Sequence, residues 1–372
     1  MADHSSPRIA DCFADLVDPR VARTRRHNLL DIITIALCGV ICGAESWVEV
    51  EDWGDAKLDW LRTWLALPHG IPSHDTFGRV FSRIDPAQFE AGFLRWVQGV
   101  VTTSAGAVVA LDGKSIRAAR TPGGNPVHLI SAWASAHRMV LGQEAVAAKS
   151  NEITAIPLLL ARLDLQDQVV TIDAIGCQRS IAAQIVEQGG DYVLALKANQ
   201  ADMLTHVRDS FALAEANGAS ASRTLGKGHG RIEVRTCRTI TDPATLAWLD
   251  PTSAWPGLRS IAQVEAERRS NGVVTTHTRY YLSSLPGEAK IIAAAVRSHW
   301  GIENQLHWVL DVAFREDMNR SRIGHSAPNL ALLRKLALNL LRTEPTRNHG
   351  IKASRLRAGW DNAYLLRVLG VK

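Results

Sequence analysis

The pattern of apolar and polar positions changes three times along the 372 residues of this chain. Up to about residue 100, apolar residues recur at helical spacing, which is typical of amphipathic helices. From residue 101 to about 200, short β-branched runs come first in succession and then alternate with helical patterns. This order favours a mixed sheet with helices on both faces. Strand patterns dominate after residue 201, and helical spacing returns near residue 289. The chain therefore predicts an α/β fold with a β-rich insertion and a helical start.

We predict four units from these changes. A helical N-terminal domain occupies residues 1–100, and a basic helical tail occupies residues 343–372. An α/β core is assembled from residues 101–200 and 289–342, and the β-rich insertion of residues 201–288 interrupts it. Within the insertion, the pair Asn271-Gly272 predicts a two-residue hairpin turn.

Two helical patterns near the end of the N-terminal region follow capping residues. Ser73 or Asp75 could cap the first, and the second begins at Asp85-Pro86. Short helices separated in this way are similar to a helix-turn-helix array, in which Arg79 and Arg83 would contact DNA phosphates. A small helical bundle packed on its neighbour is the alternative.

Two buried-strand patterns each end in an aspartate. VVALDGKSIR delivers Asp112 into a glycine-containing turn, and VVTIDAIG places Asp173 at a strand's exit. An aspartate in such a position is often a turn former or a helix cap. However, ligands gather where the strand ends of α/β sheets open towards loops. The repeated pattern therefore indicates one site shared by both carboxylates.

A third carboxylate lies in a long helical pattern over residues 289–314. Its apolar stripe indicates a packed face, and a polar row runs beside the stripe at steps of four residues. This row consists of His299, Glu303, His307 and Asp311.

Histidines and acids one helical turn apart can ligate zinc, but the chain has no H-E-x-x-H motif and no cysteine near this row. The other interpretation places Glu303 opposite Asp112 and Asp173. Three carboxylates make an oxygen-rich pocket suited to Mg²⁺ or Mn²⁺. Two such ions, about 4 Å apart, can support in-line displacement at a phosphodiester.

Composition narrows the class of protein. The five cysteines are scattered without a C-x-x-C pair, so disulfides and a structural zinc site are not expected. The net charge of +5 is compatible with a polyanionic partner but does not require one. The longest apolar run, Ile32–Ala44, is too short to span a membrane. The first residues lack the design of a secretory signal, which favours a cytoplasmic protein without a membrane partner.

Six ordered strings carry a resemblance to a known family. They are LDGKSIR, KSNEITAIP, TIDAIGCQ, GGDYVLALKANQ, HGRIEVR and HWGIENQLHWVLDVAFRED. Together they resemble the H-repeat-associated insertion-sequence transposases, which are DDE enzymes with a ribonuclease H-like core. The resemblance extends over nearly the whole chain, including SHDTFGRVFSRID in the N-terminal region.

The resemblance implies that Asp112, Asp173 and Glu303 are an acidic triad that binds two divalent metal ions, Mg²⁺ or Mn²⁺. It implies hydrolysis of a phosphodiester at the element's end, followed by attack of the freed 3′-hydroxyl on target DNA. The expected partners are double-stranded DNA and a second copy of the chain, because two ends must be joined in concert. The expected location is the bacterial cytoplasm, on the nucleoid when the protein is bound to DNA.

Several polar residues near the predicted strand ends and on the polar row are candidate DNA contacts. They are Lys114, Lys197, Asn199, Gln200, His299, Asn304 and His307. Such residues can hold phosphates, and ordinary loop polarity or packing explains them equally well.

The sequence departs from the wider supergroup at the tyrosine, arginine and lysine that usually flank the glutamate. Val296, His299 and Leu310 hold those offsets here. A metal-dependent nuclease of the same fold and a domesticated, non-catalytic DNA-binding protein stay open as alternatives. A covalent recombinase is disfavoured, because the four tyrosines all fit strand or helix packing.

Overall fold

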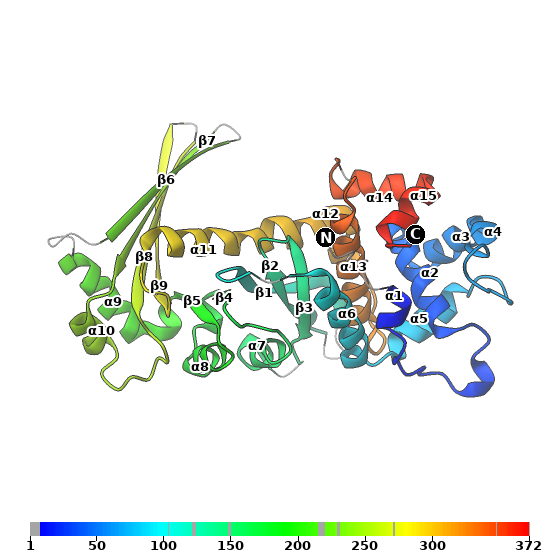
Figure 1. Ribbon diagram of the computed structural model, residues 1–372, viewed down its shortest axis with the longest axis horizontal. Coiled ribbons are helices and arrows are strands. Elements are labelled where there is room, and N and C mark those ends of the chain that lie inside the picture. Colours follow the sequence, from blue (N-terminus) through cyan, green and yellow to red (C-terminus); the bar gives the residue numbers. More distant parts are fainter. Residues whose placement is uncertain are drawn as a thin grey trace.

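The protein is elongated around one large sheet (Figure 1). The computed structural model describes residues 8–102, 104–120, 124–147, 150–214, 220–228, 231–270, 272–346 and 348–371. A long helix crosses the sheet, and a group of helices from both ends of the chain lies beyond one edge of the sheet (Figure 1).

The described residues before 101 are helical wherever they are regular, as the spacing predicts. The α-helices are α1 (Ile9–Cys12), α2 (Leu29–Cys42), α3 (Trp47–Ala56), α4 (Leu58–Leu61), α5 (His74–Arg83) and α6 (Pro86–Val100). Asp85 caps α6, since its carboxylate accepts hydrogen bonds from two N–H groups of the first turn. Helix α2 ends at Gly43, whose φ of 117° is accessible mainly to glycine.

The sheet has nine strands in the order β3-β2-β1-β4-β5-β9-β8-β7-β6. The strands are β1 (Val108–Arg120), β2 (Pro126–Ala134), β3 (Met139–Ala145), β4 (Val169–Ile172), β5 (Asp191–Leu196), β6 (Ser220–Gly228), β7 (Arg231–Ile240), β8 (Ser260–Ser270) and β9 (Val273–Ser283). Strands β1, β4 and β5 are parallel, and the other neighbours are antiparallel. The predicted mixed α/β sheet is therefore confirmed.

Helices cover both faces of the sheet. Helices α7 (Glu152–Leu160) and α8 (Arg179–Glu187) lie on one face, and α11 (Ala289–Gly301) crosses the other (Figure 1). Helix α11 continues through a π-helical turn, Ile302–His307, into α12 (Trp308–Phe314). The predicted helix over residues 289–314 is confirmed, but its central turn is π-helical and therefore wider than a turn of an α-helix.

The predicted β-rich insertion also contains two helices, α9 (Ala201–Ala214) and α10 (Pro243–Leu249). Its strands extend the central sheet, because β9 pairs with β5. Strands β8 and β9 pair up to Ser270 and Val273, which confirms the two-residue connection. Gly272 has a φ of 77° there, and Asn271 lies outside the described residues.

The strand predicted to stop at Asp112 continues to Arg120, so Asp112 does not lie in a turn. The antiparallel partner β2 explains the difference, because it keeps pairing with β1 well beyond this aspartate. Only the parallel partner ends here, at Ile172. Asp112 thus lies inside the pairing of β1 with β2, but just beyond the end of the pairing of β1 with β4.

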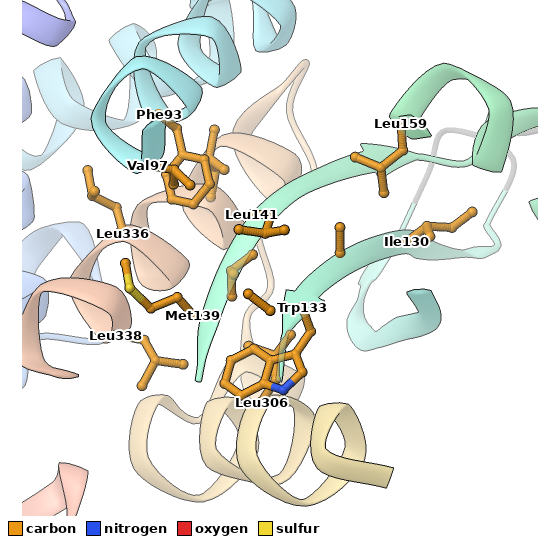
Figure 2. Close-up of a cluster of buried hydrophobic side chains, with 14 of the residues drawn as sticks. Phe93, Val97, Ile130, Trp133, Met139, Leu141, Leu159, Leu306, Leu336 and Leu338 are labelled. Carbon is orange, nitrogen blue, oxygen red and sulfur yellow. The ribbon is translucent and has the colours of Figure 1, made fainter. Parts of the chain in front are cut away.

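One hydrophobic core joins the sheet edge to the surrounding helices. Figure 2 shows Trp133 of β2 beside Leu306 of the π-helical turn. It also shows Phe93 and Val97 of α6 lying near Leu336 of α13 (Ser326–Thr343). The helical bundle interpretation of the N-terminal region fits this packing.

The basic tail forms α14 (Ile351–Trp360) and α15 (Asn362–Val368) and packs on the protein. Arg355 is buried and donates to the Val40 carbonyl of α2, and Tyr364 is buried as well. The tail therefore docks on the rest of the protein. All five cysteines are free. Across the described ranges, no single helix is long and apolar enough to cross a membrane; α2 and α3 pass that test only as a pair bent by 95°.

Candidate active site at the strand ends

The register of the sheet brings the first two carboxylates together. The parallel ladder between β1 and β4 pairs Leu111 with Ile172 as its last couple. Asp112 and Asp173 are the next residue on each strand. Neighbouring strands lie about 5 Å apart, so the two aspartates occupy adjacent positions.

Both aspartates lie on the face that α11 covers. Side chains alternate between the faces of a sheet, and Val108 and Val169 belong to the cluster packed under α11. Asp112 and Asp173 are each four residues further along, which returns them to the same face. Lys197, just beyond β5, follows Val193 of that cluster by the same interval.

Glu303 approaches from the π-helical turn and is exposed. A π-helical segment is rare and frequently lies at a functional site. Glu303, Asp112 and Asp173 line one cavity of about 160 Å³ between the strand ends and the long helix. The cavity is also lined by Thr171, Ile172, Val193, Ala195, Lys197, Arg279, Tyr281, Val296, His299 and Trp300.

The two aspartates differ in charge state. Burial and the Glu303 carboxylate raise the pKa of Asp112 to about 7. Burial also raises the pKa of Asp173, but the Ala174 N–H and the Lys197 ammonium, 3.2 Å away, outweigh it and lower the pKa below its usual value. Close carboxylates without a cation resist ionisation together. The site is thus deficient in positive charge beside Asp112.

The two histidines of the polar row, His299 and His307, lie close to residues of the strands that carry the aspartates. His299 Nδ1 lies 3.0 Å from the Thr171 hydroxyl. His307 Nδ1 lies 3.4 Å from Asp112. Burial, with Lys335 and Lys114 nearby, lowers the pKa of His307 to about 3. The imidazole is therefore neutral at pH 7, and its contact with Asp112 is not an ion pair.

Lys114 does not line the cavity, and its side chain contacts a cluster of carboxylates. Its ammonium donates to Asp311 and, at 2.8 Å, to Glu316, and it lies 3.8 Å from Asp317. The Lys114 side chain is 12% exposed and that of Glu316 is 2% exposed. Burial acts to lower the pKa of Lys114, but the surrounding acids together have the larger, opposite effect. The pKa of Lys114 is therefore raised above its usual value. This arrangement gives Lys114 a structural partner set.

A second buried lysine borders this cluster. Lys335 donates to Gln143 at 2.7 Å, and burial lowers its pKa to about 8 from 10.5. Between these values the unfolded chain binds more protons than the folded chain, so this group makes stability rise with pH. We expect the wild type to become more stable relative to Lys335→Met as the pH rises from about 8 to 10.5, measured as the difference between their free energies of unfolding. Urea titrations of both proteins across this range measure the difference, and a constant difference would contradict the prediction.

Two predicted phosphate contacts brace the loop after Asp173 instead of pointing freely to solvent. Asn199 donates to the Ala174 carbonyl at 2.7 Å, and Gln200 donates to the Cys177 carbonyl at 3.0 Å. On the long helix, Asn304 is exposed and donates to the Trp300 carbonyl.

Arg79 and Arg83 lie on α5, outside this cavity, and are exposed. The structure therefore does not bring them together with the carboxylates.

Arg279 lines the cavity, although the sequence indicates only a basic residue of the insertion and does not place it beside the acids. It lies two residues before Tyr281, which β9 places opposite Ala195 of β5, and its guanidinium stacks 4.5 Å from the Trp300 ring centroid. The alternation of β9 could have indicated its face, but the pairing of β9 with β5 has no local sequence signal.

A hydrogen-bonded chain on the opposite face of β1 was also missed. Ser115 lies 2.8 Å from His128 Nδ1, and His128 Nε2 lies 2.6 Å from Glu152. Glu152 belongs to the string KSNEITAIP, which was the available signal. The chain packs against the backbone next to Asp112.

Gly113 leaves room for that chain. A Cβ atom at this position would lie 2.2 Å from Glu152 Oε1 and 2.6 Å from His128 Nε2. We expect Gly113→Ala to displace the pair and lower the free energy of unfolding by about 1–3 kcal/mol. Chemical denaturation measures the change. The control is Gly228→Ala, because the added Cβ atom would meet nothing within 4 Å and should change stability less. Gly124→Ala would not serve, because Gly124 has a positive φ.

The carboxylates suit a divalent cation by chemistry. Oxygen ligands are those that Mg²⁺ and Mn²⁺ prefer, and a cation would offset the repulsion that raises the pKa of Asp112. In the described part of the chain, no three acids, histidines or cysteines converge closely enough to hold an ion as they stand.

Comparisons with known proteins identify the family. The model of the transposase DDE domain matches residues 103–340, and a model described as DDE_Tnp_1-associated matches residues 10–97. YncI of Escherichia coli O157:H7, which carries a transposase name, is 38% identical over 97% of this chain and 94% of its own. The H repeat-associated transposase YhhI of Escherichia coli K12 is 37% identical over 92% of both chains.

Among solved structures, a piggyBac transposase synaptic complex with hairpin DNA covers 98% of this chain and 77% of its own. Its sequence identity is 11% and its TM-score is 0.43. The family models and the relatives establish the family: this chain belongs to the DDE transposases, in the group that includes the H repeat-associated proteins.

Proposed function

We propose that this transposase cleaves DNA at the ends of an insertion sequence and transfers the freed strands to target DNA, with Asp112, Asp173 and Glu303 as its acidic triad. The observation that carries the proposal is the parallel register, which places both aspartates at adjacent positions on the face that Glu303 approaches. Three carboxylates from two strands and one helix meet at one cavity. Among the described residues, Asp112, Asp173 and Glu303 are the acids that line this cavity.

The triad would hold two divalent ions, Mg²⁺ or Mn²⁺. When bound, such ions increase the nucleophilicity of an attacking oxygen and stabilise the leaving oxygen of a phosphodiester. DDE domains generally use divalent metal ions. The raised pKa of Asp112 is consistent with this assignment, because burial first and the Glu303 carboxylate second oppose its ionisation, and a bound cation would counter both.

The remaining cavity residues supply binding and orientation. Lys197 and Arg279 present cations to the same space as the triad, where they would hold phosphate oxygens of the DNA strand. His299 is held by Thr171 on the wall of this space and would contact the DNA there. His307 is neutral and buried beside Asp112, so it would orient that carboxylate rather than bind a phosphate.

Other DNA contacts are proposed by position. Asn304 is exposed one residue from Glu303, and Arg79 and Arg83 are exposed on α5. Asn199 and Gln200 would act by bracing the Asp173 loop. Lys114 is left out of the proposed DNA contacts, because carboxylates already surround its ammonium.

The finer architecture belongs to the same proposal. Residues 101–200 and 289–342 would form a ribonuclease H-like catalytic core, with residues 201–288 as its insertion. Residues 1–100 would form the N-terminal helical domain, and residues 343–372 a helical tail. The partners would be double-stranded DNA and a second copy in the synaptic complex, acting at the nucleoid of a bacterial cell.

The test is cleavage and joining of a duplex that carries the flanking element end, with Mg²⁺ or Mn²⁺ and with EDTA. We expect metal-dependent nicking at the end, followed by joining to a target duplex. Cleavage without joining would favour a nuclease of the same fold. Binding without cleavage would favour a domesticated DNA-binding protein. Either result would contradict the proposed strand transfer.

A further inference from the structure

A second cavity lies among α2, α3 and α13, apart from the carboxylate site. Its volume is about 370 Å³, and none of its lining residues lines the first cavity. The walls are formed by Val40, Ala44, Glu45, Ser46, Trp47, Val50, Met318, Asn319, Arg320, Ser321, Leu330 and Arg334. The volume is within the range of small-molecule sites, which combine apolar walls with a few convergent polar groups.

Arg334 is a buried cation on the wall of this cavity. Its residue is 2% exposed, and Nη1 has no hydrogen-bond partner. The acids nearest to its charge, Glu316 and Glu45, each interact with another cation as well. Glu316 accepts from Lys114 at 2.8 Å, and Glu45 lies 3.2 Å from Arg315. A guanidinium desolvated in this way is costly unless an anion pairs with it.

Further donors converge on the same space. The Nδ2 group of Asn319 is buried without a partner, while its Oδ1 accepts from Ser321. Helix α3, ten residues long, begins at Trp47 on the cavity wall. The first turn of a helix leaves N–H groups without helical partners and favours anions. Ser46 occupies one of these N–H groups, that of Glu49.

Among the charged residues that line the cavity, the two arginines outnumber the single glutamate. Arg320 lines its exposed rim. Arg355 is also buried, and its guanidinium lies near that of Arg334. Two positive charges are therefore held close together in the protein interior. Glu45, which also lines the cavity, is offset by its pairing with Arg315. An anion is therefore the ligand that this set of groups favours.

We propose that this cavity binds a nucleotide phosphate, with Arg334, Asn319 and the start of α3 around the phosphate and the apolar wall beside the rest of the nucleotide. Arginine forks suit phosphate oxygens. The nucleotide is either free or one unit of a DNA strand, since both offer the same group. The inference goes beyond the proposed function, because the site is separate from the triad and requires no metal.

Isothermal titration of the full chain in EDTA tests the inference. The probes are inorganic phosphate, adenosine monophosphate and a short blunt DNA duplex. The variants are Arg320→Ala and Arg334→Lys, and the matched control is Arg322→Ala, an exposed arginine two residues away that does not line the cavity. Loss of a charge-assisted hydrogen bond should weaken binding about tenfold in the first two variants. The control should bind as the wild type does.

The probes distinguish the two sources of phosphate. Weaker binding of adenosine monophosphate in Arg320→Ala and Arg334→Lys supports a free nucleotide, and weaker binding of the duplex alone supports a DNA unit. Equal affinities of Arg320→Ala and Arg322→Ala for every probe would overturn the proposal, as would the absence of binding by the wild type. If Arg334→Lys does not fold, as judged by circular dichroism, Arg320→Ala decides. Asp173→Asn should bind the small probes like the wild type, so failure of the triad assignment is a separate result.

Discussion

Asp173→Asn is expected to lower metal-dependent cleavage and joining of an element end by about 10³-fold or more. A metal ion contributes several kcal/mol to stabilising a phosphoryl transition state, and each 1.36 kcal/mol corresponds to a tenfold change in rate. The amide keeps an oxygen that can accept from the Ala174 N–H, as Asp173 does. It removes the negative charge that two divalent cations require. Glu303→Gln should have an effect of the same size.

The matched control is Asp167→Asn, at the other end of β4. Asp167 is exposed and has a φ of 57°, a conformation that asparagine tolerates well. We expect this variant to cleave like the wild type. DNA binding in EDTA, measured by gel shift, should be retained by all three variants. Wild-type rates for Asp173→Asn and Glu303→Gln would show that the triad is assigned to the wrong residues.

Lys114→Met is expected to lower the free energy of unfolding by about 3–5 kcal/mol, the cost of removing one partner from a buried ion pair. Glu316 would keep its charge in the protein interior without the ammonium that lies 2.8 Å away. Asp311 and Asp317 would lose the same cation. Urea unfolding at pH 7 measures the change.

Two further proteins complete this test. Lys197→Met removes a lysine whose side chain is 59% exposed, and an exposed pair of this kind contributes at most about 1 kcal/mol. The double variant Lys114→Met with Glu316→Gln should recover part of the loss, because the most buried charge is then removed as well. An unchanged stability together with weaker DNA binding would return Lys114 to the DNA contacts.

The neutral state of His307 and the raised pKa of Asp112 connect the two predictions. His307 lies 3.4 Å from Asp112, and burial lowers its pKa first, with a further contribution from the Lys335 and Lys114 ammonium groups. Loss of Lys114 would therefore alter the surroundings of a triad residue without touching the cavity. Residual activity of Lys114→Met, compared with its stability, measures how strongly the cluster supports Asp112.

The sequence alone predicted most of the elements and the three acids of the proposed triad. Strand alternation, the helical stripe of residues 289–314 and the cap at Asp85 depend on neighbours a few residues away, so local patterns predict them. The same patterns indicated Asp112, Asp173 and Glu303, because each follows a recognisable strand or helix signal. The two helices of the insertion, α9 and α10, were hidden by the stronger strand patterns around them.

Tertiary structure decided how these residues meet. The register of β1 against β4 places two aspartates 61 residues apart side by side, and β9 carries Arg279 to the same cavity. The π-helical turn that holds Glu303 and the burial of Lys114 among three carboxylates have no local signal. These features arise from contacts between segments distant in the chain. Their energies depend on burial and on the charges of other elements, which become defined only when the chain has folded.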